Sequence, residues 1–148
     1  MSRIAAQETG AGWKEMADTT IDLWPIDFGI SEIEFPDVVL KKQAELLGEK
    51  TQHLVEAEVR SPDHALILHD KIRKSLYLVA PKLGGYSYRL FTIEYGIVPY
   101  PVVITGYGEE AARVCPTKEA FLVALKDIFA SEETRRVIAS LIAQSTTG

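Results

Sequence analysis

Three histidines interleaved with aspartates are the side chains best suited to hold a metal ion. They are His53, His64 and His69, accompanied by Asp63 and Asp70. Two histidines spaced by four would share one face of a helix, but His64 and His69 are five apart. That spacing separates them on a helix and places them on opposite faces of a strand. We interpret the histidines as surface or capping residues and predict no metal site.

Two carboxylates and one thiol are the next candidates for chemistry. Glu56 and Glu58 alternate along a strand-like segment, so they share a face on which they could act as an acid/base pair. The same alternation is typical of a solvated strand, which is the interpretation we prefer. Cys115 precedes a helix start, where the helix dipole could lower a thiol pKa, but no histidine with a definite position accompanies it. We interpret it as a half-buried thiol.

The remaining catalytic patterns are absent or incomplete. Gly106-Tyr-Gly108 lacks the third glycine of a phosphate-binding loop, and the glutamates that follow it would repel a phosphate. No serine lies in a nucleophile-elbow pattern. We therefore predict no catalytic residue and no cofactor, and a non-enzymatic protein is favoured over an enzyme.

The negative charge of the chain is concentrated near its beginning. The 148 residues carry a net charge of −5, and residues 1–36 hold seven acidic against two basic residues. The remaining 112 residues are balanced, with 14 of each sign. A nucleic-acid-binding protein usually shows a basic stripe, which this sequence lacks, so nucleic acid is the least favoured class of partner.

The single cysteine is typical of a protein of the reducing cytoplasm, because one cysteine cannot form an internal disulfide. Residues 1–12 are small and polar and show no export signal. No apolar run approaches the roughly 18 residues that a membrane helix requires. We expect a cytoplasmic protein without a membrane partner.

Helical periodicity positions three elements. A helix is predicted to begin at Pro36-Asp37 and to end at Gly48 as its cap, and a weaker pattern spans 13–24. Near the carboxyl end, Pro116-Thr117 opens one amphipathic helix and Ser131 caps a second.

Four strands are predicted between the first helix and the last two. The patterns cover 54–60, 72–80, 86–95 and 100–105. Proline cannot donate a hydrogen bond to a neighbouring strand, so Pro101 predicts that the fourth strand lies at a sheet edge. The order predicts an α+β fold: a four-stranded, mainly antiparallel meander with one preceding helix and two C-terminal helices on one face. We expect an acidic, partly ordered arm over 1–34 and one α+β domain over 35–148.

The densest strand signal is the hairpin of residues 75–95. If its glycine-containing turn is symmetric, Ala80 opposes Tyr86, and Leu76 and Leu78 face the helices. The second face is then predicted to carry Tyr77, Arg89, Phe91, Ile93 and Tyr95. A one-residue change of register would exchange the two faces.

That second face would be too apolar to remain in water. Each aromatic ring presents about 150–250 Å², so three rings reach the roughly 300–600 Å² of the largest apolar patch on a typical monomer. The face is therefore expected to be covered, either by the arm through residues such as Trp24 and Phe28 or by another molecule.

Two functions remain open from the sequence. The first is a non-catalytic interaction protein that binds or neutralises a protein partner, or self-associates, through Tyr77, Arg89, Phe91, Ile93, Tyr95, Trp24 and Phe28. The alternative is a small-molecule-binding protein or small enzyme with a pocket between sheet and helices.

Overall fold

A computed structural model describes residues 20–29, 34–61, 71–108 and 111–147. Its elements are, in chain order, α1 (Pro36–Lys50), β2 (Glu56–Arg60), β3 (Ile72–Ala80), the 3-10 turn η4 (Pro81–Leu83), β4 (Tyr86–Tyr95), β5 (Val102–Thr105), β6 (Arg113–Cys115), α2 (Lys118–Phe129) and α3 (Glu132–Thr147). By compactness the chain divides into Met1–Ile33 and Glu34–Gly148.

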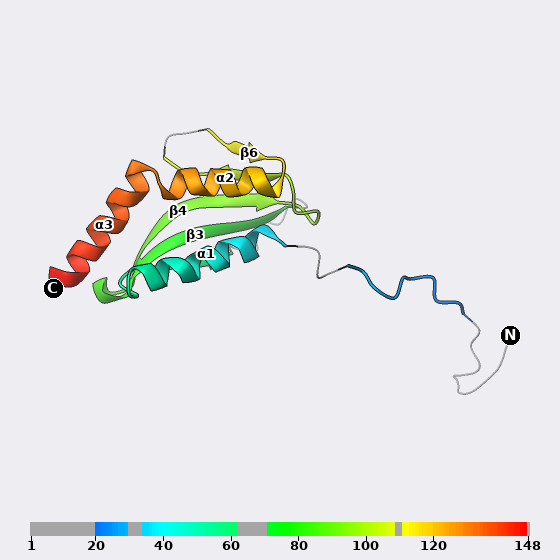
Figure 1. Cartoon of the computed structure of the whole chain (residues 1–148), viewed down its shortest axis with the longest axis horizontal. Helices are drawn as coiled ribbons and strands as arrows, with labels where there is room; N and C mark the ends of the chain where they lie inside the picture. Colours follow the sequence, from blue (N-terminus) through cyan, green and yellow to red (C-terminus); the bar gives the residue numbers. More distant parts are fainter. Residues whose placement is uncertain (1–19, 30–33, 62–70, 109–110, 148) are drawn as a thin grey trace, which may run out of the picture. The chain divides into compact units, whose positions relative to one another are not determined.

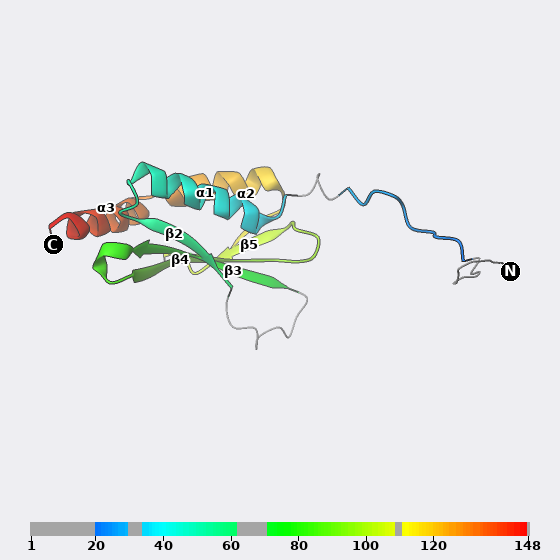
Figure 2. The same cartoon turned by 90° about the horizontal axis from the view of Figure 1, so that it is seen from below.

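The strands form one antiparallel meander in the order β2-β3-β4-β5-β6. Helices α1 and α2 lie on the same face of this sheet (Figures 1 and 2), and α3 packs near the hairpin turn. The predicted α+β meander is confirmed, with five strands instead of four. In the described ranges no helix is long and apolar enough to cross a membrane.

The extra strand changes which strand lies at the edge. β6 pairs with β5, so β5 is internal and β6 forms the edge. The prediction of an edge position for the fourth strand is therefore wrong. Its physical basis was Pro101, but β5 begins only at Val102, so the proline lies outside the ladder and removes no strand hydrogen bond.

The hairpin between β3 and β4 has the predicted symmetric turn but not the predicted register beyond its middle. Ala80 pairs with Tyr86 and Tyr77 with Arg89, as expected. Next to that pair lies a β-bulge, because Leu76 pairs with Phe91 and Leu90 is the additional residue. A bulge lets two residues of one strand oppose one residue of the other. Consequently, every residue of β4 after the bulge lies on the sheet face opposite to the predicted one.

The bulge moves three predicted surface residues into the core. Phe91 and Ile93 are fully buried and Tyr95 is 3% exposed. They share the helix-facing side of the sheet with Leu76, and the Phe91 ring stacks on Phe129 of α2 at a centroid distance of 6.4 Å. The prediction that Phe91, Ile93 and Tyr95 lie on the second face is wrong for this reason.

Helix α1 continues past the predicted cap. Gly48 lies within the helix and is buried, and the helix ends at Lys50 with Thr51 as its C-cap. A Cβ at this position would stand 2.7 Å from a Glu56 carboxylate oxygen, so a larger residue would require the Glu56 side chain to shift. The two C-terminal helices begin as expected: the Thr117 hydroxyl accepts a hydrogen bond from Ala120 N–H, and Ser131 Oγ accepts one from Thr134 N–H.

One carboxylate joins the middle of α1 to the beginning of α2. Glu34 lies 2.6 Å from Lys42 Nζ of α1 and also pairs with Lys118 at the first residue of α2. The hydrogen bond from Lys118, followed by that from Lys42, lowers the pKa of Glu34 from its ordinary 4.5 to about 2. The Glu34 carboxylate is therefore ionised over the whole physiological pH range.

Some predictions concern residues that the structure describes only in part. His64, His69, Asp63 and Asp70 lie outside the described residues, as do residues 13–19 of the weak helical pattern. Residues 20–24, which complete that pattern, are not helical.

Candidate interaction surfaces

The sheet face opposite the helices is polar. Tyr77 lies between Glu58 and Arg89 across the strands, and the Arg60 guanidinium lies 4.3 Å from the centre of the Tyr77 ring. Arg60 also pairs with Glu58 at 2.9 Å and donates a hydrogen bond to Ser87 Oγ at 3.0 Å. The Arg60 guanidinium therefore covers part of the Tyr77 ring, the aromatic ring that the hairpin presents on this face.

Further along the same face the pairing remains polar. Ser75 and Thr92 share a hydrogen bond of 2.8 Å, and Arg73 pairs with Glu94 at 2.9 Å. Arg89 is exposed and has no ion-pair partner among the described residues. The expected aromatic surface is therefore absent, and a face of this composition can remain in water without a cover.

The predicted residues of the arm do lie at the surface. Trp24 is 75% exposed and Phe28 61% exposed, and their rings lie 6.3 Å apart between centroids. Three apolar residues between and beside them, Ile21, Leu23 and Ile26, are more exposed than either aromatic residue. Residues 21–28 thus hold five large apolar side chains that are each at least 61% exposed.

This 21–28 segment contains two short copies of one pattern. Ile21-Asp22-Leu23 and Ile26-Asp27-Phe28 each place an aspartate between two apolar residues. In both copies the carboxylate accepts a hydrogen bond from the backbone N–H two residues later, at 3.1 Å for Asp22 and 2.8 Å for Asp27. Such local bonds fix the backbone without any helix or strand.

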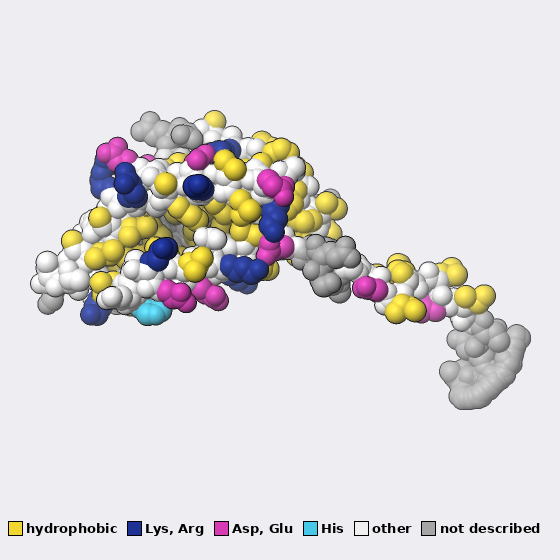
Figure 3. Space-filling view, in the orientation of Figure 1, with side chains coloured by type: hydrophobic (Ala, Val, Ile, Leu, Met, Phe, Trp, Pro, Cys, Tyr) yellow, Lys and Arg dark blue, Asp and Glu magenta, His cyan; other side chains and the backbone are white. Residues whose placement is uncertain are grey.

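A groove between α1 and α2 is a surface that the sequence did not predict in detail. Its floor is formed by the sheet residues Leu76, Leu78 and Leu90. Leu46 and Leu47 of α1 form one wall. The other wall is formed by Phe129 of α2 and by Thr134 and Ile138 of α3. The hollow measures about 270 Å³, and nine of its twelve lining residues are apolar. Figure 3 shows hydrophobic side chains gathered between the two helices.

The groove continues beyond this hollow along α2. A second hollow of about 450 Å³ shares Gln43 and Phe129 with the first and adds Leu122, Leu125 and Lys126. We call the two hollows together the interhelical groove. The signal for it in the sequence is Leu46, because a leucine beside Leu47 widens the apolar stripe of α1 beyond what a narrow helix–sheet contact buries.

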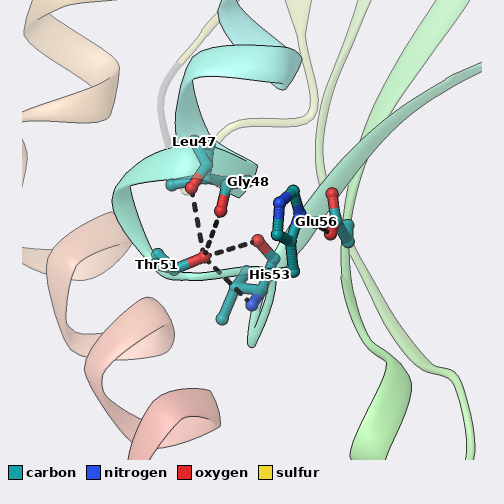
Figure 4. Close-up of polar contacts among 6 residues, drawn as sticks. Leu47, Gly48, Thr51, His53 and Glu56 are labelled. Atoms are coloured by element: carbon teal, nitrogen blue, oxygen red, sulfur yellow. Dashed lines mark hydrogen bonds and ion pairs between the residues drawn. The ribbon is translucent and has the colours of Figure 1, made fainter.

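The connection between α1 and β2 contains the one described histidine, His53 (Figure 4). The Thr51 hydroxyl accepts a hydrogen bond from Val55 N–H and lies 2.8 Å from Val55 O, with the Leu47 and Gly48 carbonyls at 3.1 and 3.4 Å. This tight turn holds Gln52 and His53 at positive φ, 53° and 64°. His53 Nδ1 lies 2.7 Å from Glu56 Oε2.

The candidate reactive groups that the structure describes, His53, Glu56, Glu58 and Cys115, are not brought together at one site. Glu56 contacts His53 and Glu58 contacts Arg60, so each carboxylate has a structural partner. Burial raises the pKa of the Cys115 thiol, and the sulfur is fully enclosed in β6 instead of half-buried. The described part of the chain contains no group of three His, Cys, Asp or Glu residues able to hold a metal ion.

The phenol of Tyr95 has a structural use as well. It forms a hydrogen bond with the Asp37 carboxylate in the first turn of α1, and burial is the main cause that raises its pKa to about 12.

Comparisons of the chain with protein-family models, curated proteins and solved structures found no match.

Proposed function

We propose that the protein is a non-catalytic interaction module that binds a partner protein through the 21–28 segment. The observation that carries the proposal is the exposure of its five large apolar side chains, from 61% at Phe28 to 102% at Ile26. Contiguous apolar surface of a few hundred Å² is characteristic of interaction sites.

Tryptophan and phenylalanine are suited to anchor such a contact. Large aromatic side chains carry much of the binding energy in protein interfaces. Burying Trp24 and Phe28 together would contribute on the order of 3–6 kcal/mol before the cost of ordering the segment. The two aspartates and the absence of basic residues in the segment favour a partner groove with basic residues at its rim.

Arg89 and the partly exposed Tyr77 remain secondary candidates on the open sheet face. Phe91, Ile93 and Tyr95 support the fold instead, because their side chains are buried. The alternative function, small-molecule binding, would use the interhelical groove, whose two hollows measure about 270 and 450 Å³ and are open to solvent, whereas a ligand pocket usually buries 70–90% of its ligand.

The proposal is tested by quantitative capture with the full chain, followed by reconstitution with the purified captured protein. Trp24→Ser is expected to weaken the reconstituted complex by about 10–150-fold, the equivalent of one buried aromatic side chain. Ile97→Ser is the matched control, because Ile97 is also 75% exposed but lies in the β4–β5 connection. Equal binding by wild type and Trp24→Ser would reject the 21–28 segment as the binding site.

A further inference from the structure

The interhelical groove carries an inference that does not depend on the 21–28 segment. It lies entirely within Glu34–Gly148, and its walls come from α1, α2 and α3. Leu46 on the α1 side is 47% exposed and Leu122 on the α2 side 41% exposed. Apolar side chains thus extend from the sheet floor to both rims, so the surface is open to a large partner.

The charges of the groove are all of one sign. Lys50 and Lys126 are its two charged lining residues, both are exposed, and no acidic side chain lines either hollow. Neither lysine forms an ion pair within the part of the chain that the structure describes. In Figure 3, Lys or Arg side chains stand on both sides of the yellow surface between the helices.

We propose that the interhelical groove binds one amphipathic helix of a partner protein that carries acidic residues beside its apolar face. Helix-in-groove recognition uses an apolar stripe at i, i+3 or i+4, and i+7. The lining residues 43–50 of α1 and 122–129 of α2 each extend about 10–12 Å at 1.5 Å per residue. That length accommodates about two turns of the docked helix.

The shape of the groove favours a helix over a small amphiphile such as a fatty acid. The main hollow is open and continues into the second along Gln43 and Phe129, so a short acyl chain would remain partly in water. A small-molecule pocket usually buries 70–90% of its ligand. A helix can instead cover both hollows and place carboxylates near Lys50 and Lys126.

The test uses the full chain and a labelled helical peptide of about 18 residues, long enough to form a helix in water. The acidic probe has leucines at i, i+4, i+7 and i+11 and glutamates at the flanking positions. A second probe has lysines in place of the glutamates, and a third has glutamines in place of the leucines. Binding is measured by fluorescence anisotropy.

We expect the acidic probe to bind with a Kd of about 1–100 μM and each of the other probes at least about tenfold more weakly. Leu46→Glu should weaken binding of the acidic probe by about tenfold or more. The double variant Lys50→Glu/Lys126→Glu should reverse the preference, so that it binds the lysine probe better than the glutamate probe. This reversal is a gain of binding that misfolding cannot produce.

Val38→Glu and Lys82→Glu are the matched controls, since both side chains are exposed and neither lines the groove. Both should bind the acidic probe as wild type does. Failure of the acidic probe to bind below about 1 mM, or binding that Leu46→Glu leaves unchanged, would overturn the proposal.

Two other occupants would also overturn it. If decanoate binds and Leu46→Glu abolishes that binding while no peptide binds, the groove takes small amphiphiles. If light scattering shows a wild-type dimer that Leu46→Glu converts to a monomer, a second copy of this chain fills the groove. Because Trp24→Ser leaves the groove intact, it should not affect the acidic probe, and this separates the groove from the 21–28 segment.

Discussion

Phe91 and Tyr77 separate the two faces of the sheet at the level of single side chains. Phe91 is fully buried under α2, whereas Tyr77 is half-buried on the polar face beneath Arg60. Phe91→Ser should lower the free energy of unfolding by about 3–5 kcal/mol, as expected for emptying a core aromatic site. Tyr77→Ser should cost about 1 kcal/mol, since it removes one cation–π contact and part of one ring. Urea unfolding of both variants measures the difference.

An equal loss of stability in the two variants would contradict the register given by the bulge.

The bulge itself could have been read from the sequence. In the segment 86–95, aromatic and apolar residues occupy the even positions up to Leu90. From Phe91 they occupy the odd positions, and Thr92 and Glu94 take the even ones. This change of phase at the adjacent pair Leu90-Phe91 is what a bulged strand requires when one face of the sheet stays buried.

At the scale of elements, strong periodicity was sufficient to predict most of the fold. The strands at 72–80 and 86–95 and the amphipathic C-terminal helices appear with the expected bounds or close to them. Strand β6 was missed because three residues, Arg113–Cys115, are too few to show alternation. The end of α1 was missed because the helix continues two residues past Gly48 and ends with Thr51 as its C-cap, whereas the local capping rule takes a glycine as the terminator.

Glu34 links two elements and makes stability depend on pH. Its folded pKa of about 2 lies below the ordinary 4.5, so its stabilising contribution is complete above about pH 4.5 and is lost as the pH falls through about 2. Glu34→Gln should therefore reduce the urea midpoint at neutral pH and have no effect below about pH 2. Glu45→Gln, an exposed change on α1, is the control. A deficit in Glu34→Gln that persists unchanged at pH 2 would exclude this ionic cause.

At the scale of the whole molecule, the hydrophobic clusters define which part of the chain folds as a unit. Every residue of both clusters lies between Phe35 and Ile142. We therefore predict that the fragment Glu34–Gly148 unfolds cooperatively at the same urea midpoint as the full chain, followed by circular dichroism. A lower midpoint or a broadened transition would show that residues 1–33 contribute to the core.

The candidate interaction surfaces were only partly accessible to sequence reasoning. Trp24 and Phe28 were singled out as anchors, and their role in binding stays a prediction. The sequence left open a pocket between sheet and helices but not the position or size of the groove, because these depend on how α1, α2 and α3 pack on the sheet. Periodicity predicts which face of a helix is apolar, but not how much of that face another element will cover.

The Glu34 ion pairs have a mechanical consequence for the groove. They tie the middle of α1, at Lys42, to the first residue of α2, at Lys118, whereas the smaller hollow is lined by the carboxyl-terminal half of α1, by Phe129 at the end of α2 and by α3. The two helices therefore share a fixed point at Glu34, and the smaller hollow of the groove lies beyond that point along both helices.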